Sequence, residues 1–211
     1  MELGQIQQAA VSCFAQRGFA ATGIRELGTA LNLNSATLYH YVGGKEELLV
    51  GIINNCLTSM IKGAGQAIAD STDPVRQLAL LVAFHVGFTA TNPKTSRVAE
   101  HEMRALSAEH AEDMQALRDD YEQLFASILA TGTTQGLFNT VDLGIARLAM
   151  MEMGTGASHW YRRDGRLSLP EVQLNFVSLA MRMLAVTDEF PLAIKELPAP
   201  LVIASEPEPK D

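Results

Sequence analysis

The chain has 211 residues, of which 47% are hydrophobic and 19% are charged, a composition typical of globular rather than disordered proteins. Its formal net charge of −8 argues against a general polyanion binder, so any contact with nucleic acid must come from a small local patch. The first residues lack the pattern of a signal peptide, and no run of about 18 apolar residues predicts a membrane span. We therefore expect a cytoplasmic protein with a sizeable core and no membrane partner.

Apolar residues recur at helical spacing along almost the whole chain, and no segment alternates as a strand would. In the first helix the stripe begins at Ile6 and ends before Gly18, a residue type that accepts the left-handed conformation at a helix end. The pattern predicts an all-α fold of about nine helices. They are expected at about 6–17, 22–31, 35–41, 45–69, 74–91, 95–105, 107–130, 142–161 and 169–186.

Side chains suited to capping stand at the start of several of these helices. The candidate caps are Thr22, Asn34 or Ser35, Asp73 followed by Pro74, and a capping box of Ser168 with Glu171. From Thr187 the chain becomes rich in proline and acid, so residues 189–211 are expected to form a loosely held tail.

The stretch "SATLYHYVGGKEELL" places three aromatic rings on a predicted helix of about seven residues. With the short helix before it and a bracing first helix, this segment is typical of a helix-turn-helix, whose second helix can enter a DNA major groove. Leu38 should point inward, which turns hydroxyls and rings outward to meet phosphates and thymine methyl groups. The outward residues are Ser35, Thr37, Tyr39, His40 and Tyr41, with Ala36 allowing close approach and Lys45 placed to meet a phosphate. The alternative is that the tyrosines are partly exposed packing residues.

Residues 6–49 resemble the DNA-binding domain of TetR-family transcriptional regulators. The resemblance rests on Phe14 with Gly18 and Phe19, Thr22 before Ile24, the run "TLYHYV", and Lys45 with Leu48. It implies that Thr22 meets a phosphate, that Arg25 reaches a base, that the helix from Ser35 to Tyr41 reads the groove, and that Lys45 meets the DNA backbone.

This segment departs from the family pattern in its charge. Residues 1–50 hold three Lys and Arg against four Asp and Glu, with no cation before Arg17, and Gly43 and Gly44 replace the usual polar cap. We therefore expect modest affinity with a shallow dependence on salt, because that dependence follows the number of phosphates neutralised. Residues 1–46 are assigned to this domain.

Residues 47–188 resemble the ligand-binding and dimerisation domain of the same family. The family implies a pocket between the helices that start near 45, 74, 107 and 142. Apolar residues on these helices are the lining candidates, although for any one of them a place in the core is the more ordinary explanation. They are Phe84, Phe88, Met103, Met114, Tyr121, Met150 and Met153.

Segments 103–125 and 159–172 further resemble a TetR subgroup that represses lipid or sterol catabolism and responds to acyl-CoA thioesters. Such an effector needs an apolar slot and cations for its phosphates. Arg104, Arg118 and Arg163 are the candidate cations, with Arg147 and Arg162 also available, and Trp160 could stack on the adenine or close the slot. Arg162 and Arg163 could equally be solvated residues that favour a helix C-terminus.

The last two helices are expected to pair with their copies in a homodimer, which would place two recognition helices on a palindromic operator. The small residues of "GTGAS" (154–158) would allow close approach. An apolar face would come from Val172, Phe176, Leu179, Met183 and Leu184.

Other functional classes are less well supported by the sequence. "HEMRA" (101–105) is not a zinc-binding HExxH motif, and no GxSxG, Walker or GxGxxG motif is present, so we expect no enzyme, cofactor or metal. Cys13 and Cys56 could form a redox switch, although space-filling thiols are commoner. A helical protein–protein adaptor that has lost strong DNA binding is the main alternative function.

Overall fold

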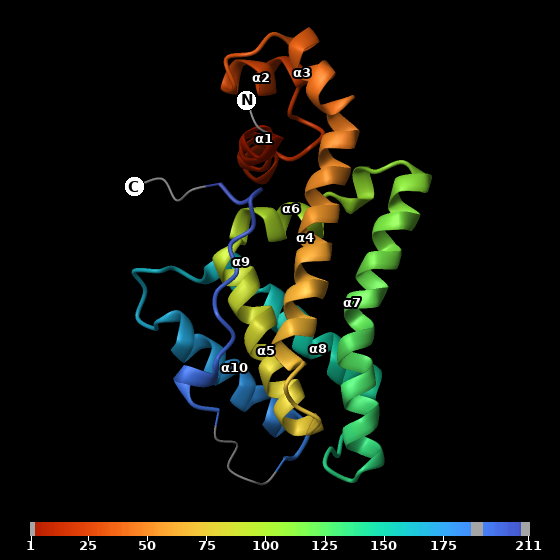
Figure 1. The fold of residues 1–211 in the computed structure, drawn as a ribbon, viewed down its shortest axis with the longest axis vertical. Helices are drawn as coiled ribbons and strands as arrows, with labels where there is room; N and C mark the ends of the chain where they lie inside the picture. The colour runs from red at the N-terminus through yellow and green to blue at the C-terminus, as the bar shows by residue number, and fades with distance from the viewer. Residues whose placement is uncertain (1–2, 187–191, 208–211) are drawn as a thin grey trace. The chain divides into compact units, whose positions relative to one another are not determined.

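The computed structural model describes residues 3–186 and 192–207, and the described residues contain ten α-helices, two 3-10 helices and no strand (Figure 1). The predicted all-α class is confirmed. The chain divides into two compact units. Unit 1 takes in Met1–Ser59, Asn92–Arg118 and Val202–Asp211, and unit 2 takes in Met60–Thr91 and Asp119–Leu201. Of the predicted tail, residues 189–191 and 208–211 lie outside the described residues.

Two long helices, α4 (Lys45–Ile68) and α7 (Ala108–Thr134), contribute to both units. The remaining helices belong to one unit each. Unit 1 contains α1 (Leu3–Arg17), α2 (Ile24–Ala30), α3 (Ser35–Val42), α6 (Pro93–His101) and the 3-10 helix η1 (Met103–Ala105). Unit 2 contains α5 (Pro74–Thr91), α8 (Leu143–Thr155), α9 (Ala157–Trp160), α10 (Leu169–Met183) and the 3-10 helix η2 (Ile194–Glu196).

Most of the predicted helix starts are confirmed by hydrogen bonds. The side chain of Asn34 accepts from the backbone N–H of Thr37 at 2.8 Å and so caps α3. Asp73 accepts from the first backbone N–H groups of α5, and Ser168 with Glu171 forms the predicted capping box of α10. The predicted cap at Thr22 is wrong, because the N-cap residue of α2 is Gly23, which makes no side-chain hydrogen bond.

The predicted helix at 142–161 is interrupted at Gly156, which gives the separate helices α8 and α9. This break accounts for ten helices where the spacing predicted about nine. Gly156 belongs to the small-residue stretch that was predicted to allow close packing of helices, and it lies instead between α8 and α9.

Unit 2 is organised around α5, which packs against α8, α9 and α10. Nearly every residue of α5 is buried, from Leu78 to Thr91. Two glycines make this close packing possible. A Cβ at Gly87 would lie 2.6 Å from the Gln173 amide nitrogen, and a Cβ at Gly154 would overlap the His85 ring.

A hydrogen-bonded polar cluster lies inside unit 2 around His85. Its Nε2 lies 3.0 Å from the Met151 carbonyl, which can only accept, so Nε2 carries the proton and Nδ1 accepts from the Tyr121 hydroxyl at 3.0 Å. Thr89 donates to the Gly154 carbonyl at 2.9 Å. Burial lowers the pKa of His85 to about 4, so this imidazole is neutral at pH 7.

His85 should make the protein less stable in mild acid. Below pH 6.5 the unfolded chain binds a proton that the folded imidazole excludes until about pH 4, so stability is lost as pH falls through this window. Relative to His85→Gln, the free energy of unfolding of the wild type should fall by about 2 kcal/mol from pH 7 to pH 5. Urea unfolding at both pH values measures this difference. NMR titration of the His85 imidazole in the wild type tests the same point without the variant. A pKa of His85 near 6.5 would contradict a buried, neutral imidazole.

Helix α4 is the one described helix long and apolar enough, by length and composition alone, to cross a membrane. Its apolar stripe is nevertheless buried within the protein, as in the core helix of a globular domain. The buried residues include Leu48, Leu49, Ile52, Ile53, Cys56, Leu57 and Met60.

The end of the chain differs from the predicted loose tail. Residues 192–207 are described throughout, and they include the helix η2 and the buried side chains of Leu192 and Ile203. The prediction is therefore wrong for this segment. Its proline and acid content suggested a solvated chain, but the apolar residues between them bury enough surface to hold it in place.

Candidate nucleic-acid interface

The turn between α2 and α3 is tight because the two helices approach within backbone contact. The Leu33 N–H donates to the Gly28 carbonyl at 2.8 Å, and a Cβ at Gly28 would lie 2.6 Å from the Leu33 carbonyl oxygen. Leu27 and Leu38 are fully buried between the helices, as the spacing predicted for Leu38. These contacts fix α3 on the surface of unit 1.

Gly28→Ala should disrupt this turn. The added methyl group meets a backbone oxygen that cannot move without shifting α3, so we expect a loss of about 2 kcal/mol or more in the free energy of unfolding. Gly65→Ala in α4 is the matched control, because a Cβ there meets nothing within 4 Å and should stabilise the helix by about 0.5–1 kcal/mol. Chemical denaturation of both variants measures the difference. Equal stabilities would show that the turn is not constrained as described.

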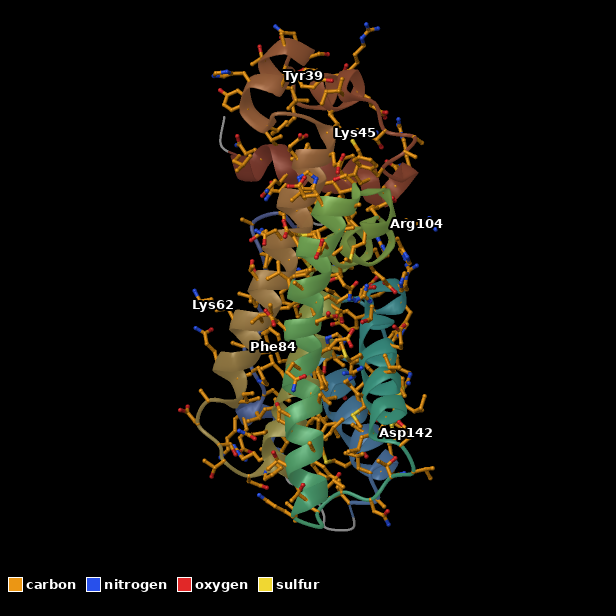
Figure 2. All side chains as sticks on the ribbon, turned by 90° about the vertical axis from the view of Figure 1, so that its right-hand side faces the viewer. Tyr39, Lys45, Lys62, Phe84, Arg104 and Asp142 are labelled. Atoms are coloured by element: carbon orange, nitrogen blue, oxygen red, sulfur yellow. The ribbon has the colours of Figure 1, made fainter. Side chains whose placement is uncertain are left out.

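Helix α3 presents its aromatic residues outward. Tyr39 is 47% exposed, Tyr41 is 45% exposed, and the His40 ring is exposed beside Tyr41 with ring centroids 6.1 Å apart. Ala36 is also exposed, and Ser35 and Thr37 are half-buried. Tyr39 lies on the surface of this unit (Figure 2). The structure thus brings these predicted DNA-binding residues together on one short helix.

The placement of Thr22 argues against the expected phosphate contact by its hydroxyl. Thr22 is fully buried, and its hydroxyl donates to the Gly18 carbonyl at 2.8 Å. This bond lies within the loop between α1, which ends at Arg17, and α2, which begins at Ile24. The residue therefore shapes the loop between the two helices, a role that the resemblance did not indicate.

Lys45 also differs from its expected role. Its ammonium donates to the carbonyls of Phe19 and Thr22 at 2.9 and 3.0 Å, and it lies 4.1 Å from the centroid of the Phe19 ring. Lys45 is labelled at the start of α4 in Figure 2. Because its charge is directed at protein carbonyls, the predicted contact with the DNA backbone is at odds with this conformation.

Positive charge near α3 is correspondingly scarce. Arg17 pairs with Glu26, and Lys45 is directed inward, while the Arg25 side chain is exposed on α2. The predicted shallow salt dependence of DNA binding therefore has a structural basis, because few cations are presented to phosphates.

Two carboxylates in unit 1 make contacts that the sequence did not predict. Glu46 accepts from the Ser107 N–H at 2.7 Å and from His110 Nδ1 at 2.8 Å, and these bonds lower the pKa of Glu46 to about 2 and raise the pKa of His110. Glu102 accepts from the Phe19 N–H at 3.2 Å. Both join the helix-turn-helix to segments some 60 and 80 residues away, so no local sequence pattern could have revealed them.

The candidate effector-binding residues fall into both units. In unit 2, Phe84, Phe88, Tyr121 and Met150 are buried, and Met153 is half-buried. Trp160 and Arg163 are exposed in the same unit. Met103, Arg104, Met114 and Arg118 lie in unit 1, where Arg118 contacts the Met103 sulfur at 3.7 Å and Arg104 is exposed.

A cavity of about 230 Å³ opens in unit 2 beside the loop between α9 and α10. Its lining includes Trp160, Tyr161, Arg162 and Arg166. The Trp160 ring stacks on Phe176 with centroids 6.1 Å apart and planes 16° apart. Of the arginines considered as candidate cations, Arg162 lines this cavity, together with Arg166, which the sequence did not single out.

Cys56 does not have the properties of a redox-active thiol. Burial raises the pKa of Cys56 to about 12, so its reactive thiolate form is suppressed. The alternative of a redox switch with Cys13 therefore receives no support from the structure.

Family models match the two parts of the chain separately. Residues 6–52 match "Bacterial regulatory proteins, tetR family", and residues 71–184, more than half of the chain, match "Tetracyclin repressor-like, C-terminal domain". The chain belongs to the TetR family. The TetR-family fold predicted from the N-terminal residues is thus confirmed along most of the sequence.

Among curated proteins, the chain is 26% identical over 180 residues to the HTH-type transcriptional repressor KstR2 of Rhodococcus jostii, covering 83% of this chain and 87% of KstR2. A tetR-family regulatory protein from Rhodococcus RHA1 has a similar crystal structure, with 28% identity, a TM-score of 0.82 and coverage of 89% and 100%. AibR in complex with isovaleryl coenzyme A and operator DNA shares the fold, with 22% identity, a TM-score of 0.76 and coverage of 84% and 97%.

Membership of the TetR family identifies a DNA-binding transcriptional regulator and not an enzyme. The run "TLYHYV" lies on the short helix α3, the second helix of the helix-turn-helix. The effector and the operator are finer properties that family membership does not supply.

Proposed function

We propose that this protein is a homodimeric repressor that leaves a palindromic operator when it binds a small apolar effector. The observation that carries the proposal is the outward face of α3, on which two half-exposed tyrosines stand beside the buried Leu38. On a helix held by the Asn34 cap, these rings can reach base edges without rearrangement of the turn.

The surfaces of α8 and α10 support dimerisation. Ile145 and Leu148 on α8 and Leu179 on α10 are exposed apolar side chains of unit 2. Val172 and Leu184 were expected on this face but are buried within the chain. Gly154 was expected to bring subunits together, but it admits the His85 ring inside unit 2. We therefore expect the dimer interface to use Ile145, Leu148 and Leu179, together with the half-buried Phe176 and Met183.

The effector class that we favour is an acyl-CoA thioester. The cavity beside α9 offers an aromatic surface at Trp160 together with two arginines, which suits an adenine ring and phosphates. The cavity lining also includes the apolar residues Leu167 and Val172, which suit an apolar acyl group. AibR, of the same fold, binds isovaleryl coenzyme A, and this agrees with the proposed class.

Release would follow from a change in the spacing of the two recognition helices. Helix α4 begins at Lys45, next to the helix-turn-helix, and extends into unit 2. An effector that binds one position of α4 better than another shifts the population toward that position. Since the duplex fixes the half-site spacing, a shift of a few ångströms would disfavour binding.

Operator binding with and without acyl-CoA thioesters tests this function. The full-length protein is titrated onto duplexes from its own upstream region, with CoA thioesters of several chain lengths and free CoA as a control. We expect sequence-specific binding that one length class weakens by about tenfold or more. Specific binding that no thioester changes would reject the acyl-CoA effector class but would not contradict a DNA-binding regulator.

A second candidate is a protein–protein adaptor with weak or no DNA binding. The scarcity of free positive charge favours it, because Arg17 is paired with Glu26 and the Lys45 ammonium contacts carbonyls. Absence of specific binding even at about 50 mM salt, where phosphate contacts are strongest, would favour the adaptor.

A further inference from the structure

The last described residues of the chain belong to unit 1, although they follow a segment of unit 2. In unit 2 the Arg76 guanidinium donates to Glu196 at 2.9 Å and Leu192 is buried. From Val202 onward the chain contributes to unit 1, where its blue trace is seen beside α6 (Figure 1). We call residues 192–207 the C-terminal strap.

The strap is fixed in unit 1 by specific hydrogen bonds. The Ile203 N–H donates to the fully buried Asn92 side chain at 2.9 Å, and Asn55 of α4 donates to the buried Ser205 hydroxyl at 3.3 Å. These bonds reach two separate parts of unit 1 within three residues of the strap. A solvated tail would not satisfy buried polar groups in this way.

Glu206 makes two hydrogen bonds to the backbone of α6. It is only 7% exposed, and its carboxylate accepts from the N–H groups of Lys94 and Thr95 at 3.2 and 2.8 Å. Both N–H groups lie in the first turn of α6, where they have no acceptor within the helix. A negative charge at this position also interacts favourably with the helix dipole. The chain thus supplies the anion for this helix terminus from more than 100 residues away.

The opposite end of α6 contacts the helix-turn-helix. Helix α6 packs against α1, and Glu102, the residue after α6, accepts from the Phe19 N–H between α1 and α2. Phe19 is also the residue whose carbonyl and ring hold Lys45. A displacement at the start of α6 would therefore also displace the loop that orients α2 and α3.

We propose that the C-terminal strap is an intramolecular clasp that holds α6 through Glu206 and so keeps the helix-turn-helix in its DNA-binding arrangement. Within unit 1, Ile203, Ser205 and Glu206 of the strap all make hydrogen bonds that hold the clasp. This inference rests on the proposed operator binding and adds to it a regulatory element outside the residues 71–184 of the family's C-terminal domain.

The test compares full-length wild type with Glu206→Gln and with a chain that ends after Leu201. Glu112→Gln is the matched control, since Glu112 is an exposed acid of α7 in the same unit. Hydrogen exchange of the Lys94 and Thr95 amides is measured without DNA, and affinity is measured on a duplex that the wild type binds specifically.

Both clasp variants should exchange these two amides about tenfold faster and bind the duplex about threefold or more weakly, and the control should do neither. Unchanged exchange would overturn the clasp. Faster exchange with unchanged affinity would overturn its link to DNA binding. If the wild type itself binds no duplex specifically, the proposed function fails, while the exchange data still decide whether Glu206 holds α6.

Discussion

Replacing Tyr39 or Tyr41 with alanine should weaken operator binding by about tenfold to a hundredfold, because each lost base contact is worth about 1–3 kcal/mol. Both rings are nearly half exposed on α3, so each substitution should change the free energy of unfolding by less than about 1 kcal/mol. Affinity is measured by fluorescence anisotropy, and stability is measured by thermal unfolding of the same samples.

Tyr39→Phe and Tyr41→Phe are the matched controls for these variants. They keep the ring and remove the hydroxyl, so they separate an apolar contact with thymine methyl groups from a hydrogen bond to a phosphate. If both alanine variants bind the operator as tightly as the wild type, α3 does not read the groove through these rings.

Lys45→Met should destabilise the helix-turn-helix and weaken DNA binding, with little change in the salt dependence of binding. The ammonium makes two hydrogen bonds to carbonyls and lies against the Phe19 ring, so its loss should lower the free energy of unfolding by about 1.5–3 kcal/mol. The measurement combines urea unfolding with operator affinity at several salt concentrations.

The salt dependence decides between the two roles of Lys45. A lysine that meets a phosphate contributes about one unit to the slope of log affinity against log salt, and a lysine that braces the fold contributes none. Arg25→Met serves as the comparison, because this exposed side chain on α2 should lower the slope and leave stability nearly unchanged. If Lys45→Met reduces the slope without lowering the free energy of unfolding, Lys45 contacts a phosphate and does not brace the fold.

Local patterns in the sequence predicted the helices well. Helix starts at Ser35, Lys45, Pro74 and Leu169 follow from capping residues and apolar spacing, which act over a single helical turn. The burial of Leu38 between outward-facing neighbours follows from the same periodicity.

Features that depend on contacts between distant residues were not predictable from these patterns. The Lys45 ammonium could turn to DNA or to the loop at Phe19, and only the folded chain shows that two carbonyls lie within its reach. Likewise, the sequence placed Glu206 in a solvated acidic tail, whereas in the folded chain its carboxylate accepts hydrogen bonds from the first turn of α6. Glycine has no side chain beyond a hydrogen atom, so the sequence does not distinguish a Gly154 that contacts another subunit from one that admits the His85 ring.

Selection of bound duplexes from a random-sequence pool tests most directly whether α3 reads DNA in a two-fold assembly. The wild-type protein should enrich a palindrome whose half-sites lie about one or more helical turns apart, and the Tyr39→Ala, Tyr41→Ala double variant should not enrich it. A pool that shows no enrichment with the wild type, or the same enrichment with the double variant, would contradict this account.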